Sequence, residues 1–153
     1  MTITHQVEEY KTCIDDIVPL FYNHWKEVAN NQDTVPLDPD FDRYKALEDQ
    51  GMMRIFTVRS GIDRTLIGYF ISFISPHMHY KSTVYAINDI LYMDPQYRGG
   101  TQAYRMMRGA IEDLRDNCNV DRLVIHMKVD HEFRRLMKSL GGTLTEENWE
   151  IKL

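Results

Sequence analysis

Residues 89–110 constrain the fold of this 153-residue chain more than any other stretch. They read DILYMDPQYRGGTQAYRMMRGA, which is an apolar strand, a turn marked by proline, a pair of glycines and then a helical pattern. Gly99 and Gly100 let backbone N–H groups turn inward without a Cβ in the way, and the first turn of a helix adds amides that lack an intrahelical partner. The stretch therefore predicts an anion-binding turn, with a plain connection in an α/β protein as the alternative.

Composition is that of an ordinary soluble globular protein. The chain is 43% hydrophobic and 27% charged, and its length suffices for one core without metal or disulfide support. Its net charge of -5 disfavours non-specific binding of nucleic acid and favours cationic partners, amines included. Cys13 and Cys118 are far apart and show no CxxC or Cys/His spacing, so we expect reduced thiols and no metal site.

Neither end of the sequence predicts a membrane or secretory segment. No stretch approaches the roughly 18 apolar residues that a bilayer span requires. The first residues include Glu8 and Glu9 and lack the basic start and apolar core of a signal peptide. We expect a cytoplasmic protein that binds neither membrane nor nucleic acid. The oligomeric state is left open, with a homodimer as one option.

The N-terminal part predicts helices. Apolar residues recur there at spacings of three and four, interrupted by Pro19, so we expect either two short helices over Gln6–Val18 and Leu20–Asn30 or one kinked helix. We expect most of these apolar residues to lie in the core. Tyr22, His24 and Trp25 are the exceptions, and we expect them to overhang a substrate cleft. A second helix is predicted to begin at an Asp38 N-cap and to end at Gly51.

From Met52 onward the period changes to two, which predicts strands over 52–59, 65–75 and 84–93. The segment 65–75 is apolar on both faces, as in a central strand. Gly68 indicates a bulge or a close backbone approach, and 76–81 is expected to be a loop. Simple alternation along the third strand would place one set of side chains on a common face: Tyr85, Ile87, Asp89, Leu91 and Met93.

The C-terminal part predicts a helix over 102–115, a strand over 121–127 and a helix that Asp130 caps and Gly141 ends. Leu144 and 149–153 are expected to form two closing strands. We therefore predict the α/β fold class, with residues 1–153 forming a single domain.

The residues of the glycine turn carry a resemblance to a known family. Arg98-Gly99-Gly100-Thr101-Gln102-Ala103 resembles the Arg/Gln-x-x-Gly-x-Gly/Ala motif of the GNAT superfamily of acyl-CoA-dependent N-acyltransferases, and the preceding 92–97 resembles that family's lead-in. Thr101 stands where the motif usually has its second glycine. The segments 37–40 and 77–80 also resemble segments of small GNAT proteins from bacteriophage genomes.

The resemblance implies a mixed, mostly antiparallel central sheet flanked by helices, with the strand, glycine loop and helix forming the cofactor site. It implies acetyl-CoA as co-substrate and no metal. The pyrophosphate would bind the loop amides, and the acyl carbonyl and pantetheine would bind where two strands splay apart. The residues so implied in cofactor binding are Leu91, Tyr92, Met93, Arg98, Gly99, Gly100, Thr101, Gln102, Ala103 and Asp130, the last at the position of a family Asn.

Acyl transfer from a thioester to an amine needs a base for the amine and a donor for the forming oxyanion. Asp89 is a candidate catalytic base, because a carboxylate in an apolar strand is costly unless it is bonded or faces a wet cleft. The alternative is a structural aspartate. His77 and His79 are the other catalytic candidates, against the alternative of solvated loop residues, and His126 is a further one.

At the position where the resemblance implies the family's general acid, a Tyr on the last main helix, this sequence has Met137. Either the thiolate leaves without an acid, Tyr80 or Tyr97 substitutes, or the protein is not a competent enzyme. The leading hypothesis is an acetyl-CoA-dependent N-acetyltransferase that moves an acetyl group directly to a primary amine of a small molecule or protein. The competing hypotheses are a catalytically impaired GNAT-like module that engages a partner protein, with or without bound CoA, and an enzyme for longer acyl groups.

Overall fold

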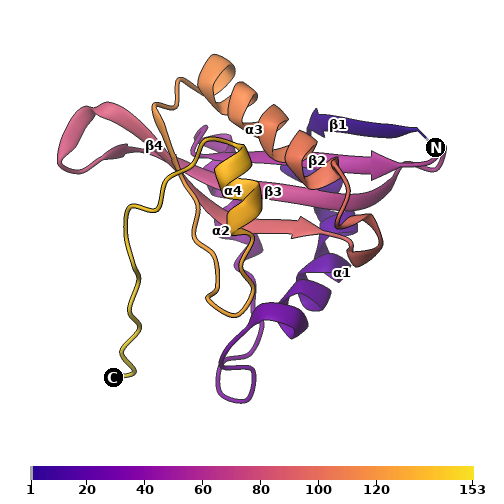
Figure 1. The fold of residues 1–153 in the computed structure, drawn as a ribbon, viewed down its shortest axis with the longest axis horizontal. Coiled ribbons are helices and arrows are strands. Elements are labelled where there is room, and N and C mark those ends of the chain that lie inside the picture. The colour runs from indigo at the N-terminus through magenta and orange to yellow at the C-terminus, as the bar shows by residue number, and fades with distance from the viewer. Residues whose placement is uncertain (1) are drawn as a thin grey trace.

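The computed structural model describes residues 2–153, which form a five-stranded sheet with helices on both faces (Figure 1). The strands and helices, in chain order, are β1 (Ile3–Val7), α1 (Tyr10–Val28), α2 (Phe41–Asp49), β2 (Met53–Ser60), β3 (Thr65–His77), β4 (Tyr80–Met93), the short 3-10 helix η1 (Pro95–Tyr97), α3 (Gln102–Cys118), β5 (Arg122–Val124) and α4 (Arg134–Ser139).

The strands lie side by side in chain order, β1-β2-β3-β4-β5. The first four pair antiparallel, and β5 runs parallel to β4. The central strand β3 is buried continuously from Leu66 to Ser72, as its apolar sequence predicts for a strand that is covered on both faces. The predicted fold class, a mostly antiparallel mixed sheet between helices, is confirmed.

Two apolar clusters, one on each face of the sheet, hold the layers together. The α3 face buries Phe56, Phe70, Met106 and Met107, against which parts of α4 pack. The opposite face buries side chains of α1 together with β3 and β4 residues, and α2 packs beside them: Cys13, Ile17, Phe21, Tyr69, Ile71 and Tyr92. Figure 1 shows α3 lying across the sheet, with the loop of α1 and α2 extending beyond it.

The predicted start of the first helix is wrong, and the choice between two short helices and one helix is decided in favour of one. Gln6 and Val7, the predicted start of the helix, belong instead to the strand Ile3–Val7, which pairs antiparallel with β2 from Phe56 to Ser60. The helix then runs unbroken from Tyr10 through Pro19 to Val28. Pro19 is exposed, so water can satisfy the carbonyl that its missing N–H leaves free.

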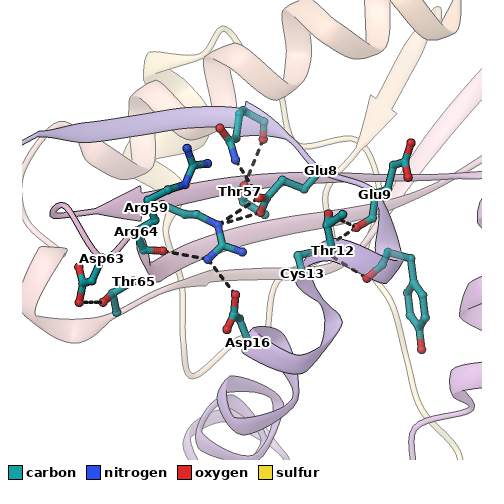
Figure 2. Close-up of polar contacts among 12 residues, drawn as sticks. Glu8, Glu9, Thr12, Cys13, Asp16, Thr57, Arg59, Asp63, Arg64 and Thr65 are labelled. Carbon is teal, nitrogen blue, oxygen red and sulfur yellow. Dashed lines mark hydrogen bonds and ion pairs between the residues drawn. The ribbon is translucent and has the colours of Figure 1, made fainter.

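An ion network centred on the buried Arg59 of β2 includes Glu8, directly after β1, and Asp16 of α1 (Figure 2). The Arg59 side chain is 8% exposed; its Nε donates to both carboxylate oxygens of Glu8 at 3.0 and 3.1 Å. Its Nη1 lies 2.8 Å from the Asp16 carboxylate and donates to the carbonyl oxygen of Arg64 at 2.9 Å. Nearby, burial raises the pKa of the free Cys13 thiol to about 12. The contacts of Arg59 with Glu8 and Asp16 hold the start of α1 against the sheet.

The strand β4 contains a β-bulge that the alternating pattern did not predict. Its pairing with β3 shifts register where Ile71 faces Ile90 and Ser72 faces Asn88, so Asp89 is the extra residue. As a result Asp89 and Ile90 both point to the α1 and α2 face. The expectation that Asp89 shares a face with Leu91 and Met93 is wrong, because the bulge reverses the phase of the strand.

The structure also bears on two smaller expectations, the loop over 76–81 and the role of Gly68. The predicted loop over 76–81 is mostly strand, since β3 continues to His77 and β4 begins at Tyr80. Gly68 is indeed a point of close approach, because a Cβ there would lie 3.1 Å from the Tyr92 carbonyl oxygen. It also faces Val58 where the pairing of β2 and β3 shifts register.

Helix boundaries differ from the prediction where the capping residue was misassigned. Asp40, not Asp38, caps α2 by accepting a hydrogen bond from the Arg43 amide at 2.9 Å. Phe133, not Asp130, precedes α4. Gly51 and Gly141, at the ends of these helices, adopt the left-handed conformation that their sequence positions predict.

The C-terminal segment is the largest departure from expectation. Neither Leu144 nor 149–153 forms a strand, and β5 is three residues long rather than seven. The chain after α4 runs away from the sheet, as the yellow end of the ribbon shows (Figure 1). Its large side chains are mostly exposed: Leu144 73%, Trp149 87%, Ile151 80% and Leu153 113%.

Candidate functional site

The glycine loop forms an open cradle between η1 and α3. Gly99 has a φ of +80°, which only glycine adopts freely. A Cβ on Gly99 or on Gly100 would meet no atom within 4 Å, so the space in front of the loop is free. Thr101 is the N-cap of α3, and its side chain makes no cap hydrogen bond. The amides of the first turn and the positive helix end therefore face an accessible volume, which suits an anion.

The unusual residue of the motif, Thr101, causes no strain. Its φ of -89° and ψ of -2° lie in the right-handed helical region, which a β-branched residue tolerates. A glycine at this position is therefore not required for the loop to adopt its path.

Arg98 anchors the loop rather than reaching into it. Its Nε donates to the Met93 carbonyl oxygen at 2.7 Å, and its Nη atoms donate to both oxygens of Glu27 at 2.5 and 2.8 Å. The Arg98 guanidinium also lies 5.9 Å from the centre of the Tyr92 ring. These contacts connect the loop to the last turns of α1, and the neighbouring arginine lowers the pKa of the Glu27 carboxyl.

The parallel ladder between β4 and β5 is short and ends before the glycine loop. The parallel pairing joins Tyr85–Ile87 to Arg122–Val124. The Asn88 side chain then continues the ladder, since its Nδ2 donates to the His126 carbonyl oxygen at 3.1 Å and its Oδ1 accepts from the His126 amide at 2.6 Å. Beyond this bridge, residues Leu91–Met93 pair with β3 alone among the described strands. Pairing on this side of β4 thus ends before the positions at which two strands are predicted to splay apart, and the splay itself stays a prediction.

A pocket of about 620 Å³ opens beside this end of β4. One wall comes from α1, with Phe21, His24 and Trp25, and another from Tyr44 of α2. Asp89 and Ile90 supply the floor from the bulge. The rest of the lining comes from the loop between α1 and α2, from Lys128 and from Glu150 of the C-terminal segment.

Asp89 is the polar centre of the pocket. The Tyr44 hydroxyl donates a short hydrogen bond to Asp89 Oδ2. Burial raises the pKa of the Asp89 carboxyl, and the hydrogen bond from Tyr44 opposes that rise. A half-buried carboxylate with one fixed donor retains lone pairs for a second partner, so it can receive a cationic or hydrogen-bonding group from a ligand.

His24 lies on the side of the pocket nearest the glycine loop. Its ring centre is 5.6 Å from that of Tyr92, the same ring that Arg98 contacts. Burial lowers the pKa of His24; Glu27 raises it, and Arg98 and His131 lower it further. An imidazole in this position is a proton acceptor at neutral pH.

The structure separates the other predicted residues from this pocket. His77 and His79 lie at the turn of the β3 and β4 hairpin, where the His77 ring centre is 4.8 Å from Tyr80 and 4.6 Å from Tyr85. Neither histidine lines the pocket around Asp89. Asp130 is exposed in the loop before α4, and His126 meets Asn88 only through its backbone.

The two tyrosines proposed as general acids also lie elsewhere. The Tyr97 hydroxyl is 3.1 Å from Ser60 Oγ, and Tyr80 belongs to the hairpin cluster. Met137 is half-buried in α4. Of the predicted cleft residues, His24 and Trp25 line the pocket, whereas Tyr22 is 49% exposed and does not.

Sequence reasoning did not find Tyr44, Lys128 or Glu150. Tyr44 read as an apolar position of a helix, and no local pattern showed that its hydroxyl would meet a carboxylate 45 residues further along the chain. Lys128 and Glu150 are exposed charged residues on irregular segments, which gave no signal.

A larger hollow of about 770 Å³ lies elsewhere, between the start of α1, the end of α2 and the end of α3. Its lining includes Glu8, Glu48, Arg54 and Asn117, and none of the loop or bulge residues described above. Among residues 2–153, no three His, Cys, Asp or Glu side chains are grouped to hold a metal ion. Within the same residues, no helix combines the length and apolarity needed to cross a membrane.

The sequence matches no family model, and it matches no curated protein. Solved structures do match the whole fold. A predicted acetyltransferase from Clostridium acetobutylicum with acetyl-CoA has a TM-score of 0.75 and 15% identity, covering 99% of this chain and 96% of the other. Glucosamine-6-phosphate N-acetyltransferase from Arabidopsis thaliana has a TM-score of 0.73 and 9% identity, covering 99% of both chains.

An aminoglycoside acetyltransferase from an uncultured soil metagenomic sample, in complex with sisomicin, has a TM-score of 0.69 and 10% identity, covering 99% of this chain and 93% of the other. Identities this low show the fold alone. The fold is that of the GNAT acetyltransferases, so the resemblance drawn from the glycine loop is confirmed at the level of fold. The likeness to bacteriophage proteins stays a prediction.

Proposed function

We propose that this chain is an acetyl-CoA-dependent N-acetyltransferase that transfers an acetyl group directly to a primary amine. The observation that carries the proposal is the joint placement of an open glycine cradle at the start of α3 and a pocket with a carboxylate floor beside the same end of β4. The likeness of the whole fold to acetyltransferases, one of them with acetyl-CoA, supports it.

The residues of the cradle fit the diphosphate of coenzyme A. Free space in front of Gly99 and Gly100 and the uncapped first turn of α3 supply the amide donors that a phosphate group needs. In this assignment the backbone of Leu91–Met93 holds the acyl and pantetheine part. The bound co-substrate supplies an activated acetyl thioester.

The pocket of about 620 Å³ is assigned to the acceptor amine. Asp89 attracts a protonated amine by charge, and Phe21, Trp25 and Tyr44 surround it with aromatic surface, which also favours cations. Acceptors with amino groups are consistent with the neighbours that are named for glucosamine-6-phosphate and for aminoglycosides. The acceptor is a small molecule or an exposed amine of a protein.

The substitution Gly100→Val tests the cofactor site. Gly100 lacks a positive φ, and a Cβ added there would meet no protein atom within 4 Å, so the fold is expected to keep its thermal midpoint. A ligand on the loop amides would meet the valine. We expect calorimetry to show acetyl-CoA affinity falling at least about tenfold, which corresponds to about 1.4 kcal/mol.

The matched control is Glu146→Val, an equally exposed position far from the loop in sequence, which is expected to bind acetyl-CoA as the wild type does. Wild-type protein that shows neither heat nor thermal protection with acetyl-CoA would refute the cofactor assignment.

A binding module without catalysis is the second candidate, and one observation favours it. Met137 cannot donate a proton, and the tyrosine hydroxyl nearest the glycine loop in sequence, that of Tyr97, is engaged with Ser60. Release of free thiol from acetyl-CoA, measured over a panel of primary amines, separates the two functions: binding of acetyl-CoA without thiol release from any amine supports the module.

A further inference from the structure

The proposed reaction requires a group that takes a proton from the acceptor, because an amine attacks only in its neutral form. The sequence suggested Asp89, His77 and His79 for this task. The hairpin histidines lie outside the pocket, and Asp89 is already the partner of the Tyr44 hydroxyl. The pocket also contains Asp38, Lys128 and Glu150, which are exposed, whereas His24 is half-buried and comes from the helix wall of α1.

The position of His24 is fixed by its helix. His24 and Glu27 are three residues apart on α1, so they lie on the same side of that helix, one turn apart. Glu27 is bonded to Arg98 at the edge of the glycine loop. His24 contacts Tyr92 and lines the pocket with Asp89. The helix thereby holds an imidazole between the loop assigned to the cofactor and the carboxylate assigned to the amine.

We propose that His24 is the catalytic base, which removes the proton from an amine that Asp89 holds in the pocket. This inference rests on the proposed function and deepens it. It gives the two side chains separate tasks: Asp89 binds the ammonium group, and an unprotonated ring nitrogen of His24 accepts its proton.

The proton and bond balance is complete. The ammonium group gives one proton to His24, and its nitrogen forms a C–N bond to the acetyl carbon while the C–S bond breaks. The second proton leaves the nitrogen and neutralises the departing thiolate, and His24 returns its proton to water. Three charged or titratable groups act electrostatically on the imidazole, which lies beside the Tyr92 ring: Glu27 on α1, Arg98 after η1 and His131 before α4.

The protonation state of His24 suits this task. Burial lowers the pKa of His24 below its ordinary value of 6.5, and the positive groups Arg98 and His131 lower it further against Glu27. The base form is thus predominant at pH 7. Activity is expected to fall as the pH drops through the lowered pKa of His24, because the protonated ring cannot accept a further proton.

Two substitutions separate the tasks. His24→Gln keeps a polar side chain of similar size, and we expect kcat to fall about 10²-fold with a flattened acidic limb of the pH profile. Asp89→Asn is expected mainly to raise KM for the amine and to keep the acidic limb. The controls His77→Gln and His79→Gln are expected to match the wild type in kcat and in pH profile. If His24→Gln keeps both the kcat and the acidic limb of the wild type, the proposal is overturned.

A second measurement works without turnover. In the NMR spectrum of ¹⁵N-histidine-labelled wild-type protein, addition of coenzyme A with 1,3-diaminopropane as the probe amine is expected to shift the ring nitrogens of His24 and to leave those of His77 and His79 in place. Failure of every amine to release thiol would remove the proposed function, whereas thiol release with an unperturbed His24 ring would remove only the role of His24.

Discussion

Asp89 is the residue at which stability and the proposed function oppose each other. Its carboxyl is half-buried in the bulge of β4, and burial raises its pKa despite the hydrogen bond from Tyr44. A carboxyl whose pKa is raised by folding binds protons more strongly in the folded state. Its contribution to stability is therefore present below the unfolded pKa and is lost as the pH rises through the folded pKa.

The substitution Asp89→Asn is accordingly expected to stabilise the fold at neutral pH. The amide oxygen of asparagine can still accept from the Tyr44 hydroxyl, and no buried charge remains. The thermal midpoint of Asp89→Asn is expected to exceed that of the wild type at pH 8, and the difference is expected to vanish below the ordinary pKa of 3.8. A midpoint at pH 8 equal to or below that of the wild type would contradict this account.

The sequence identified Asp89 because a charged residue in an apolar strand is visible as an exception. It also predicted that His24 and Trp25 lie at a cleft, and both line the pocket of about 620 Å³. The hydrogen bond between the Tyr44 hydroxyl and Asp89 could not be predicted from the sequence, because it depends on how α2 packs over the sheet. Local patterns thus predict which residues are unusual, whereas tertiary packing decides what they meet.

At the level of elements, the errors in prediction arise where pairing overrides a local period. Val7 fits the apolar spacing of the helix that follows, which is why the helix was predicted to begin near it. Residues 3–7 instead pair antiparallel with β2 along their whole length. The alternation along β4 failed at one residue, since a bulge changes which side chains share a face without altering composition.

The contacts of Arg59 allow a prediction of how much this one side chain contributes to the stability of the fold. Arg59→Met would leave Glu8, whose side chain is 12% exposed, without its cationic partner and with only the hydrogen bond from Gln6. Removing one member of a buried ion pair costs about 3 to 5 kcal/mol. We expect a loss of that order in the free energy of unfolding, measured by denaturant titration.

The matched control for this prediction is Lys45→Met. Lys45 pairs with Asp49 on the surface of α2, where both side chains are more than half exposed at 63% and 59%. Exposed pairs of this kind contribute about 0 to 1 kcal/mol. Equal losses in Arg59→Met and Lys45→Met would show that the buried network has no special role.

On the scale of the whole molecule, the sequence predicted the sheet, its flanking helices and the turn between β4 and α3. It did not predict that the segment after α4 forms no strand. The alternation of Trp149, Ile151 and Leu153 is typical of a strand, but a strand also needs a neighbour with free backbone groups. The segment lies away from the sheet instead, and only Glu150 reaches the pocket, with its Oε1 3.2 Å from Asn31 Nδ2.

The exposure of Trp149 is directly measurable. In the variant Trp25→Phe, Trp149 is the sole tryptophan, and at 87% exposure its fluorescence is expected to be red-shifted and readily quenched by iodide. In Trp149→Phe, the half-buried Trp25 is expected to emit at shorter wavelength and to resist quenching. A blue-shifted, protected Trp149 would mean that the segment packs against protein in solution.

The side chain of Asn88 substitutes for a backbone rung where β4 and the chain after β5 begin to part. A carboxamide has a fixed reach, so the fork between these two segments opens at a point set by one residue. A homologue that carried glutamine there would hold its fork wider by one methylene. Under the proposed function, the residue that sets this spacing is therefore not among those assigned to hold the acyl group.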